Sequence, residues 1–384
     1  MPERVAIVGV GYSDIRSITP GLSYKEMMYE AAVRAYEDAG VNPRKDVDSF
    51  ISVSEDFWEG TSIFDEYIPD QLGAALRPVH TVSGDGIHGL ACAAMLIHTG
   101  RARVVVVEGH SKHSDMRTPA HIHNFAYDPI YHRPLGAHPH HLAGLEMTRF
   151  LFESGNTREH CALVVKKNMA NALLNPRAVY GARVSLRDVL EAPPTFSPLG
   201  ELDIARPADG GFVMVLAGES VAGDLAGDPI WIAGYGWCTE TPAIDSRLWG
   251  EAIYAQLAAK QAYRMAGITD PFRELDFAEV DDSFSYKELE HLEALGICRH
   301  GEAGGWLEDG LTLPGGDFPV NVSGGSLGGG HLLEATGLHR VHEVVLQLRG
   351  QAGENQLPDV ERGLAQSWRN LPTTTGCVVI LERA

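Results

Sequence analysis

The chain has 384 residues and a formal net charge of -20, with 44% hydrophobic and 21% charged residues. This acidic balance, without a run of Lys and Arg, excludes a broad nucleic-acid-binding face. No apolar run approaches the length of a membrane span and the N-terminus lacks a secretory signal pattern, so we expect a cytoplasmic protein with no membrane partner. The five scattered cysteines favour neither a disulfide framework nor a zinc ribbon.

The first part of the chain alternates strands with helices. The predicted elements are a strand at 5–10, a helix at 23–40, a strand at 49–53, a helix at 86–100 and a strand at 103–108. The first helix is marked best, because Ser23 and Glu26 form a capping-box pattern and Gly40 stands at its C-terminal stop. This rhythm predicts a layered α/β sheet.

Residues from about 109 to 198 interrupt the rhythm. The segment is rich in His, Pro and aromatic residues, and we expect helices at 140–153 and 157–174 within it. A break of this length predicts a loop insertion that covers a site, before a strand at 210–218 resumes the pattern.

The second part of the chain repeats the coarse order of the first. The predicted elements are strands at 229–236, 277–280 and 376–381, and helices at 248–267, at 285–296 and after the glycine-rich loop to about 348. We therefore predict an N-terminal half, residues 1–225, that carries the insertion, and a C-terminal half, residues 226–384.

Residues 110–141, within the insertion, hold eight histidines, namely His110, His113, His121, His123, His132, His138, His140 and His141. Imidazole is a common metal ligand, but the spacings match no recognised ligand set, so we expect no metal site and predict instead that some of these histidines line a substrate pocket. The glycine run at 325–330 lacks the spacing and strand context of a dinucleotide-binding loop.

The stretch from Asn321 to Gly337 resembles the N-x-x-G-G-x-x-x-x-G-H-P-x-G-A-T-G signature of thiolases, with His331 in the histidine column. Further markers at 157–159, 166–168, 175–178 and 284–296 resemble those of sterol-carrier-protein-type thiolases. The resemblance implies a duplicated βαβαβαββ fold in five layers (α-β-α-β-α), a homodimer, and CoA bound under the insertion. Leu332 and Glu334 depart from the family's proline and glycine.

The two cysteines that thiolases use are absent from the positions where the resemblance places them. The first column, at the start of a helix, falls on Gly86, and the C-terminal C-x-L-G-x-G-G pattern reads Asn370 to Gly376 here. Claisen chemistry needs a thiol, so ordinary thiolase activity is not expected. Cys92 and Cys377 are expected in the core, and no base is indicated for Ser83.

A third family element, H-D-x-F or N-E-x-F, reads Asp281-Asp282-Ser283-Phe284. Adjacent carboxylates repel, which raises one pKa towards the range of a general base. The alternative is that one Asp caps the helix that begins at Ser285 and the other faces water. Tyr286, on the first turn of that helix, either reaches the pocket or packs at the surface.

The missing thiols make the chain similar to the steroid side-chain aldolases of the lipid-transfer-protein-like branch. That resemblance implies retro-aldol cleavage of a β-hydroxyacyl-CoA, a steroid side-chain thioester among the candidates, with a small OB-fold partner in a heterotetramer. Those aldolases use tyrosines around the pocket, and two of these tyrosine positions correspond to His331 and Asp281 in this chain. No cofactor is expected apart from coenzyme A within the substrate.

We assign the base to Asp281 or Asp282, and to His331 the support or protonation of the enolate. Predicted substrate contacts are Ser83, Gly86, Asn321, Ser323 and Gly325, with Gly86 leaving room for a bulky acyl chain. Two alternatives stay open: a non-catalytic acyl-CoA-binding subunit or scaffold, and an acyltransferase with a non-standard nucleophile such as Ser83.

Overall fold

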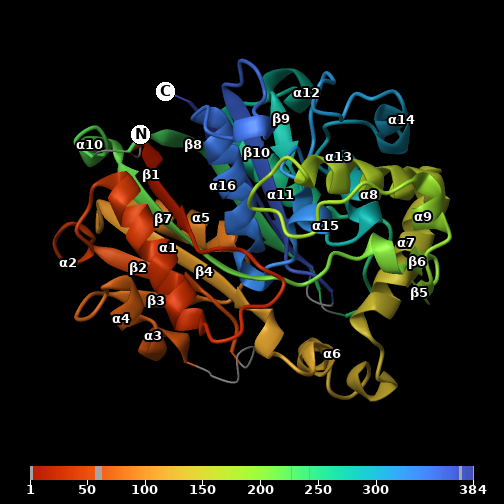
Figure 1. The fold of residues 1–384 in the computed structure, drawn as a ribbon, viewed down its shortest axis with the longest axis horizontal. Helices are drawn as coiled ribbons and strands as arrows, with labels where there is room; N and C mark the ends of the chain where they lie inside the picture. The colour runs from red at the N-terminus through yellow and green to blue at the C-terminus, as the bar shows by residue number, and fades with distance from the viewer. Residues whose placement is uncertain (1–2, 57–62, 226, 242, 372–373, 384) are drawn as a thin grey trace.

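The computed structural model describes residues 3–56, 63–225, 227–241, 243–371 and 374–383. Within these ranges one mixed sheet has the strand order β3-β2-β4-β7-β1-β8-β11-β10-β9 (Figure 1). The strands are β1 (Val5–Tyr12), β2 (Ser49–Val53), β3 (Val79–Val82), β4 (Val104–Lys112), β7 (Asp209–Gly218), β8 (Ile230–Thr239), β9 (Phe277–Glu279), β10 (Arg362–Trp368) and β11 (Thr375–Glu382). A separate small ladder pairs β5 (Pro194–Phe196) with β6 (Leu199–Gly200).

The longer helices are α1 (Tyr24–Ala39), α5 (Gly86–His98), α7 (Pro139–Ser154), α8 (Arg158–Ala172), α11 (Ile253–Ala266), α13 (Ser285–Ala294) and α16 (Thr336–Leu348). The short ones are α2 (Pro43–Asp46), α3 (Phe64–Tyr67), α4 (Pro69–Leu72), α6 (Pro119–His123), α9 (Leu186–Leu190), α10 (Glu219–Ala222), α12 (Pro271–Glu274), α14 (Ala303–Glu308) and α15 (Gly325–Gly329).

The sheet shows an internal duplication. From one edge the strand order is β3-β2-β4-β7-β1, and from the other edge it is β9-β10-β11-β8. The strands β2, β4, β7 and β1 correspond in order to β9, β10, β11 and β8, and the parallel bridge of Val320 to Ala278 beside β9 takes the place of β3. The two halves meet where β1 pairs antiparallel with β8, at Ala6–Trp231 and Ile7–Ile230. The similar order of the two halves in the sequence thus reflects a duplicated fold.

Alternating side chains show how the layers stack. On β1, Ala6 and Val8 pack in the cluster that contains α1, whereas Ile7 packs in the central cluster with α5 and α16. On β11, Val378 packs with α11, and the next residue, Val379, packs with α16. The two halves of the sheet, joined at β1 and β8, thus form separate layers, and the order is α1, first half-sheet, α5 with α16, second half-sheet, α11, which confirms the predicted five-layer fold.

Most predicted elements are confirmed, and the differences have local causes. Ser23 Oγ accepts the Glu26 N–H at 3.4 Å, and Gly40 ends α1 in the left-handed region at φ 66°. The helix expected at 248–267 begins only at Ile253, because Gly250 (φ 84°) turns the chain just before it. β3 and β10 were not predicted.

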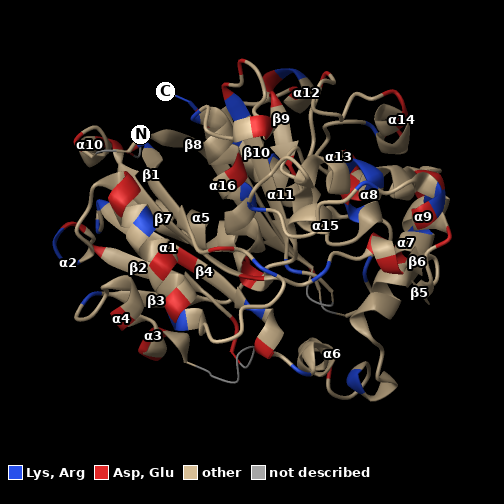
Figure 2. Ribbon diagram, in the orientation of Figure 1, with Lys and Arg blue, Asp and Glu red and all other residues tan. Residues whose placement is uncertain are grey.

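Figure 2 colours the ribbon by residue type, and the Lys and Arg positions are interspersed with the Asp and Glu positions along it. None of the described helices is both long enough and apolar enough to span a bilayer.

Candidate active site

A cavity of about 380 Å³ lies between the insertion and the C-terminal half. From the C-terminal half its wall includes His331, Ser283, Phe284, Trp368 and Asn370. The predicted insertion thus does border a cavity, and the histidine of the glycine-rich loop faces it.

His331 is positioned by its backbone. The glycine-rich loop bends through Gly324 (φ 105°) and Gly330 (φ 108°), conformations that favour glycine. The His331 N–H then donates to Arg206 O at 2.8 Å, and Ala208 N–H donates to His331 O at 2.9 Å. These contacts fix the residue at the cavity wall.

Burial lowers the pKa of His331 to about 4, so the imidazole is neutral at neutral pH. The Leu333 N–H lies 3.3 Å from Nδ1, and Asn370 Nδ2 lies 2.8 Å from Nε2. Both ring nitrogens therefore have a polar neighbour, and the Asn370 amide helps to hold the orientation of the ring.

Asn370 was missed by the sequence analysis. It stands in the column of the second thiolase cysteine and adopts φ 71°, which asparagine tolerates better than most residues. Its position in that column was the only signal that could have identified it.

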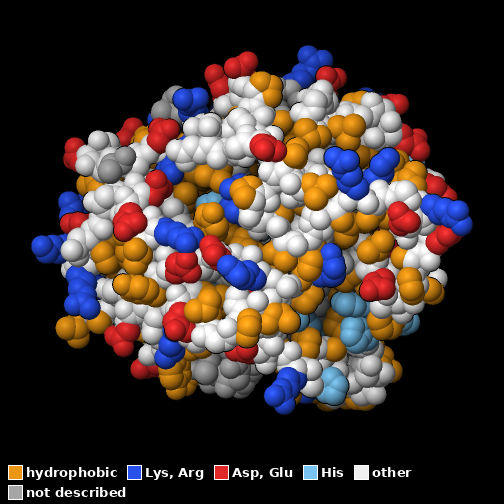
Figure 3. All heavy atoms as spheres, viewed as in Figure 1, with side chains coloured by type: hydrophobic (Ala, Val, Ile, Leu, Met, Phe, Trp, Pro, Cys, Tyr) orange, Lys and Arg blue, Asp and Glu red, His pale blue; other side chains and the backbone are white. Residues whose placement is uncertain are grey.

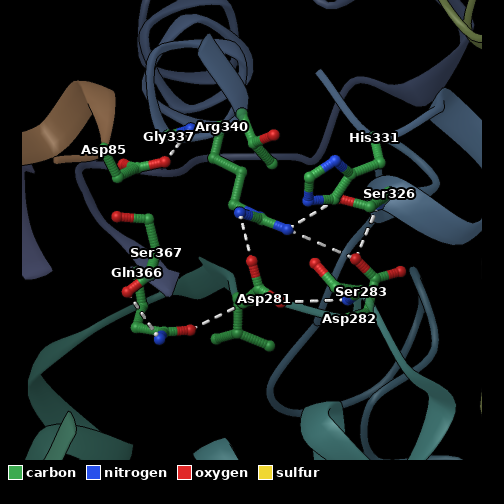
Figure 4. A network of polar contacts seen from close by, with 12 residues as sticks. Asp85, Asp281, Asp282, Ser283, Ser326, His331, Gly337, Arg340, Gln366 and Ser367 are labelled. Carbon is green, nitrogen blue, oxygen red and sulfur yellow. Dashed lines mark hydrogen bonds and ion pairs between the residues drawn. The ribbon is translucent and has the colours of Figure 1, made fainter. Parts of the chain in front are cut away.

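Asp281 and Asp282 converge on one buried guanidinium (Figure 4). Arg340 Nη1 lies 2.8 Å from Asp281 Oδ2, and Arg340 Nη2 lies 3.5 Å from Asp282 Oδ1. Burial acts to raise the pKa of Asp281, but Arg340 outweighs it and holds that pKa below its usual value. Burial raises the pKa of Asp282 to about 6 despite Arg340.

Asp282 also holds the glycine-rich loop. Its carboxylate accepts the backbone N–H of Ser326 at 2.6 Å and of Leu327 at 3.1 Å, and a Cβ on Gly325 would lie 2.2 Å from Asp282 Oδ2. Both aspartates are fully buried, and neither is among the residues that line the cavity. Neither one faces water, contrary to the alternative interpretation, and the geometry does not support either as the base.

The predicted contacts Asn321 and Ser323 hold the fold together instead of lining the cavity. Asn321 Oδ1 accepts the Val280 N–H at 2.8 Å, and its Nδ2 donates to Glu288 Oε2 at 2.7 Å. Ser323 donates through its hydroxyl and its backbone N–H to the buried Glu279.

Tyr286 neither reaches the cavity nor packs at the surface. Its side chain is fully buried, and its hydroxyl donates to Glu146 Oε2 at 2.6 Å. The same glutamate lies 2.8 Å from Lys287 Nζ, so Tyr286 belongs to a buried charge network.

Gly86 does not open space for an acyl chain, contrary to the prediction. A Cβ on Gly86 would lie 2.5 Å from Leu338 Cγ and 2.6 Å from Leu338 N, because the start of α16 packs against the start of α5. Asp85 joins the two helix ends, accepting the N–H of Ile87 and of Gly337 at 3.0 Å each. The first cysteine column is therefore filled by Leu338.

Within the described part of the chain, neither a cysteine thiol nor the predicted nucleophile Ser83 borders the cavity. Burial raises the pKa of all five cysteine thiols, and none of them lines the cavity. Ser83 is exposed outside it, where its hydroxyl donates to Glu55 Oε1 at 3.0 Å and accepts from Arg369 at 3.3 Å.

Four of the eight histidines at 110–141 line the cavity, as predicted for a subset: His113, His123, His138 and His140. Burial lowers the pKa of each, to about 4 for His123 and His140. Figure 3 shows histidine side chains gathered below and to the right of the centre of that view. Over the described residues no group of three His, Cys, Asp or Glu is arranged to hold a metal ion. The cavity is thus bordered by neutral imidazoles.

Comparison with known proteins gives consistent matches over the whole chain. Residues 245–383 match the family "Thiolase C-terminal domain-like". The chain is 31% identical to an acetyl-CoA acetyltransferase of Methanothermobacter thermautotrophicus, covering 94% of this chain and 95% of the relative. It is 29% identical to sterol carrier protein 2 of Homo sapiens, covering 94% and 69%.

Two further matches concern aldolases. A steroid side-chain-cleaving aldolase of Thermomonospora curvata is 28% identical, with 97% of each chain covered. The solved structure of an Ltp2-ChsH2(DUF35) aldolase superposes with a TM-score of 0.85 at 26% identity, covering 100% of this chain and 98% of that one. With the fold and the site, these matches show that the chain belongs to the thiolase superfamily, in its branch similar to sterol carrier protein 2.

Proposed function

We propose that this thiolase-fold enzyme is a carbon–carbon lyase that cleaves a β-hydroxyacyl-CoA by a retro-aldol reaction. One observation carries the proposal: neither position of the two thiolase cysteines has a thiol, but His331 still lines the cavity. Leu338 fills the space beside Gly86 at the first position, and Asn370 occupies the second position next to His331. Retro-aldol cleavage needs proton transfer and enolate stabilisation, but it needs no covalent nucleophile.

The proposed step balances as follows. A base takes the proton of the β-hydroxyl, the Cβ–O bond becomes a carbonyl, and the Cα–Cβ bond breaks. Its electron pair forms the thioester enolate, which takes a proton at Cα. The products are a ketone or aldehyde and a shorter acyl-CoA. His331 is neutral and borders the cavity, so it is the group best suited to exchange these protons.

In this proposal Asp281 and Asp282 position other groups and do not transfer protons. The carboxylate of Asp281 pairs with Arg340, and that of Asp282 holds the backbone of the glycine-rich loop. A steroid side-chain thioester is the first substrate to test, since one relative is named a steroid side-chain-cleaving aldolase. The name of the solved relative, Ltp2-ChsH2(DUF35) aldolase, supports a partner protein, for which we propose a small OB-fold subunit. A homodimer and a cytoplasmic location are part of the same proposal.

Acyl transfer is the second candidate, because a relative at 31% identity is named an acetyltransferase. It requires a nucleophile with a neighbouring base. Among the described residues, Ser283 is the serine that lines the cavity, and its hydroxyl has no hydrogen-bond partner there. The geometry therefore favours cleavage.

The test is incubation with a panel of β-hydroxyacyl-CoA thioesters, with and without an OB-fold partner, while released ketone or aldehyde is measured. Release that disappears in His331→Ala supports the proposal. Tight CoA binding without any release would favour a non-catalytic subunit, and a covalent acyl adduct in the intact mass would favour transfer.

A further inference from the structure

His138 is a hydrogen-bond donor among the residues that line the cavity. It caps the N-terminus of α7, and its Nδ1 accepts the His140 N–H at 3.1 Å. An atom that accepts this bond carries no proton, and because burial lowers the pKa of His138 the ring is neutral, with its proton on Nε2. Within the described part of the chain the cap bond is the one hydrogen bond of this ring, so the Nε2–H has no protein acceptor there.

The orientation of the His138 ring is set by packing. The ring stacks on Phe196 of β5, with centroids 5.0 Å apart and an interplanar angle of 16°. The His140 ring meets it edge-on at 4.7 Å and packs in turn against Phe284 at 5.6 Å. His138, His140 and Phe284 all line the cavity, and we call these three residues the aromatic wall. The donor is therefore held in place before any ligand binds.

A plain alkyl chain would leave this donor unpaired. The surface beside the imidazoles is apolar, because Ile204 pairs with Phe284 in an isolated bridge, Pro139 follows His138, and all of them line the cavity. Methylene groups that lie there would remove water from the Nε2–H without replacing its hydrogen bond, which lowers affinity. An oxygen atom on the acyl chain would accept the bond. The aromatic wall thus favours an oxygenated chain over a saturated one.

Glu201 limits the charge of that oxygen. The residue directly follows β6, the strand paired with β5, and it lines the same cavity. Its carboxylate would repel a second carboxylate on the acyl chain. The two arginines of the cavity are held by other partners, since Arg369 pairs with Glu55 and Arg206 lies over the ring of Tyr180. A neutral acceptor such as a ketone oxygen therefore fits this part of the cavity.

We propose that the cavity takes an acyl-CoA whose acyl group carries a ketone oxygen beyond the thioester, and that His138 donates a hydrogen bond to this oxygen. The proposed function assigns His331 to the thioester, which leaves the aromatic wall to contact another part of the acyl group. The inference rests on the acyl-CoA binding of that proposed function, and it narrows the substrate class to acyl groups with a second, neutral oxygen.

Titration calorimetry tests this with thioesters that have no β-hydroxyl and so do not undergo the proposed cleavage. The oxo compounds are 4-oxopentanoyl-CoA, 5-oxohexanoyl-CoA and 6-oxoheptanoyl-CoA, each paired with the saturated acyl-CoA of the same length. We expect the wild type to bind at least one oxo compound about three- to tenfold more tightly than its saturated partner, the effect of one hydrogen bond.

Two variants remove the donor in different ways. His138→Asn keeps the cap of α7, because asparagine is among the best N-cap residues, and His138→Phe keeps a ring that can stack on Phe196. Both should abolish the preference for the oxo compound and leave binding of its saturated partner nearly unchanged. His141→Asn is the matched control, because His141 packs edge-on against the same Phe196 at 6.1 Å but does not line the cavity.

The outcomes separate this inference from the proposed function. Equal affinities within every pair in the wild type would overturn the inference and leave acyl-CoA binding standing. A preference that persists in both His138 variants, or that His141→Asn also abolishes, would overturn the role of His138. If His138→Asn weakens free CoA as much as the thioesters, the ring contacts CoA itself and the assignment to the acyl group is wrong. A wild type that binds none of the thioesters would overturn both proposals.

Discussion

Asn370 Nδ2 lies 2.8 Å from His331 Nε2, in the column where the resemblance places a thiolase cysteine. An amide cannot act as the acyl-capturing nucleophile that a thiol provides, but it can orient the imidazole beside it. The histidine therefore keeps a partner at this position while the covalent chemistry of the position is lost.

His331→Ala is expected to lower the rate of carbonyl release by about 10²- to 10⁴-fold, the usual contribution of a positioned acid or base. Binding of CoA thioesters should change little, because the other cavity residues remain. The control is His80→Ala, an exposed histidine on β3 outside the cavity. Unchanged release by His331→Ala would remove this histidine from the mechanism.

Asn370→Ala is expected to lower kcat about tenfold, the effect of one lost hydrogen bond of about 1.4 kcal/mol, with KM nearly unchanged. If Asn370 acts by orienting His331, the two effects are not additive. The His331→Ala/Asn370→Ala double variant should then be no slower than His331→Ala alone. Additive losses in this cycle would show that Asn370 acts independently of the imidazole.

Gly86→Cys is expected to destabilise the fold and not to restore thiolase activity. The new Cβ would lie 2.5 Å from Leu338 Cγ, and overpacking of this kind costs about 1–3 kcal/mol. Urea unfolding measures the loss. Gly305→Ala is the control, because a Cβ on that helical glycine meets nothing within 4 Å and alanine favours a helix. Equal stability of Gly86→Cys and the wild type would mean that Leu338 can move aside for the new side chain at little cost in free energy.

The elements that the sequence predicts well are those with local signals. α1 has a capping box and a left-handed glycine at its end, and β4 is a run of valines. β3 lacks such a signal, because Val79–Val82 is short and partly exposed, and β10 carries Gly363 and Gln366 within its span. Both strands form because their neighbours in the sheet offer backbone partners.

The site depends more on contacts between distant residues. His331 could be identified from its glycine-rich loop, whereas the loss of space at Gly86 follows from Leu338, far along the chain on another helix. Likewise, two adjacent aspartates suggest a perturbed carboxylate, but only the fold brings Arg340 against both of them. Such pairings leave no local pattern in a single sequence.

Arg340→Met is expected to destabilise the chain by about 3–5 kcal/mol, because it leaves two buried carboxylates without their cation. Denaturant unfolding at neutral pH measures this, and the loss should shrink in acid as Asp281 and Asp282 become protonated. The control is Arg187→Ala, which removes an exposed pair with Glu191 and should cost less than about 1 kcal/mol. A similar small cost for both variants would show that Arg340 is dispensable.

Glu279 makes the stability depend on pH in a predictable direction. Burial raises its pKa from 4.5 to about 8, against the hydrogen bonds donated by Ser323. The folded state therefore holds this proton more tightly than the unfolded state, so its contribution to stability is fully present below pH 4.5 and is lost as pH rises to about 8. Between these values the slope for this one group approaches about 1.4 kcal/mol per pH unit.

Glu279→Gln keeps the shape of the side chain and removes the titrating proton. The variant should therefore gain stability relative to the wild type as pH rises from 5 to 9, which urea unfolding at pH 5, 7 and 9 measures. Asp85, whose pKa burial raises to about 6, titrates in both proteins and so cancels in the difference. Asp282 interacts with Glu279 and raises its pKa, so the difference between the two curves reports the titration of Glu279 together with this interaction. If the two stability curves run parallel across this range, Glu279 is already ionised in the folded chain and its contact with Ser323 is a charged hydrogen bond.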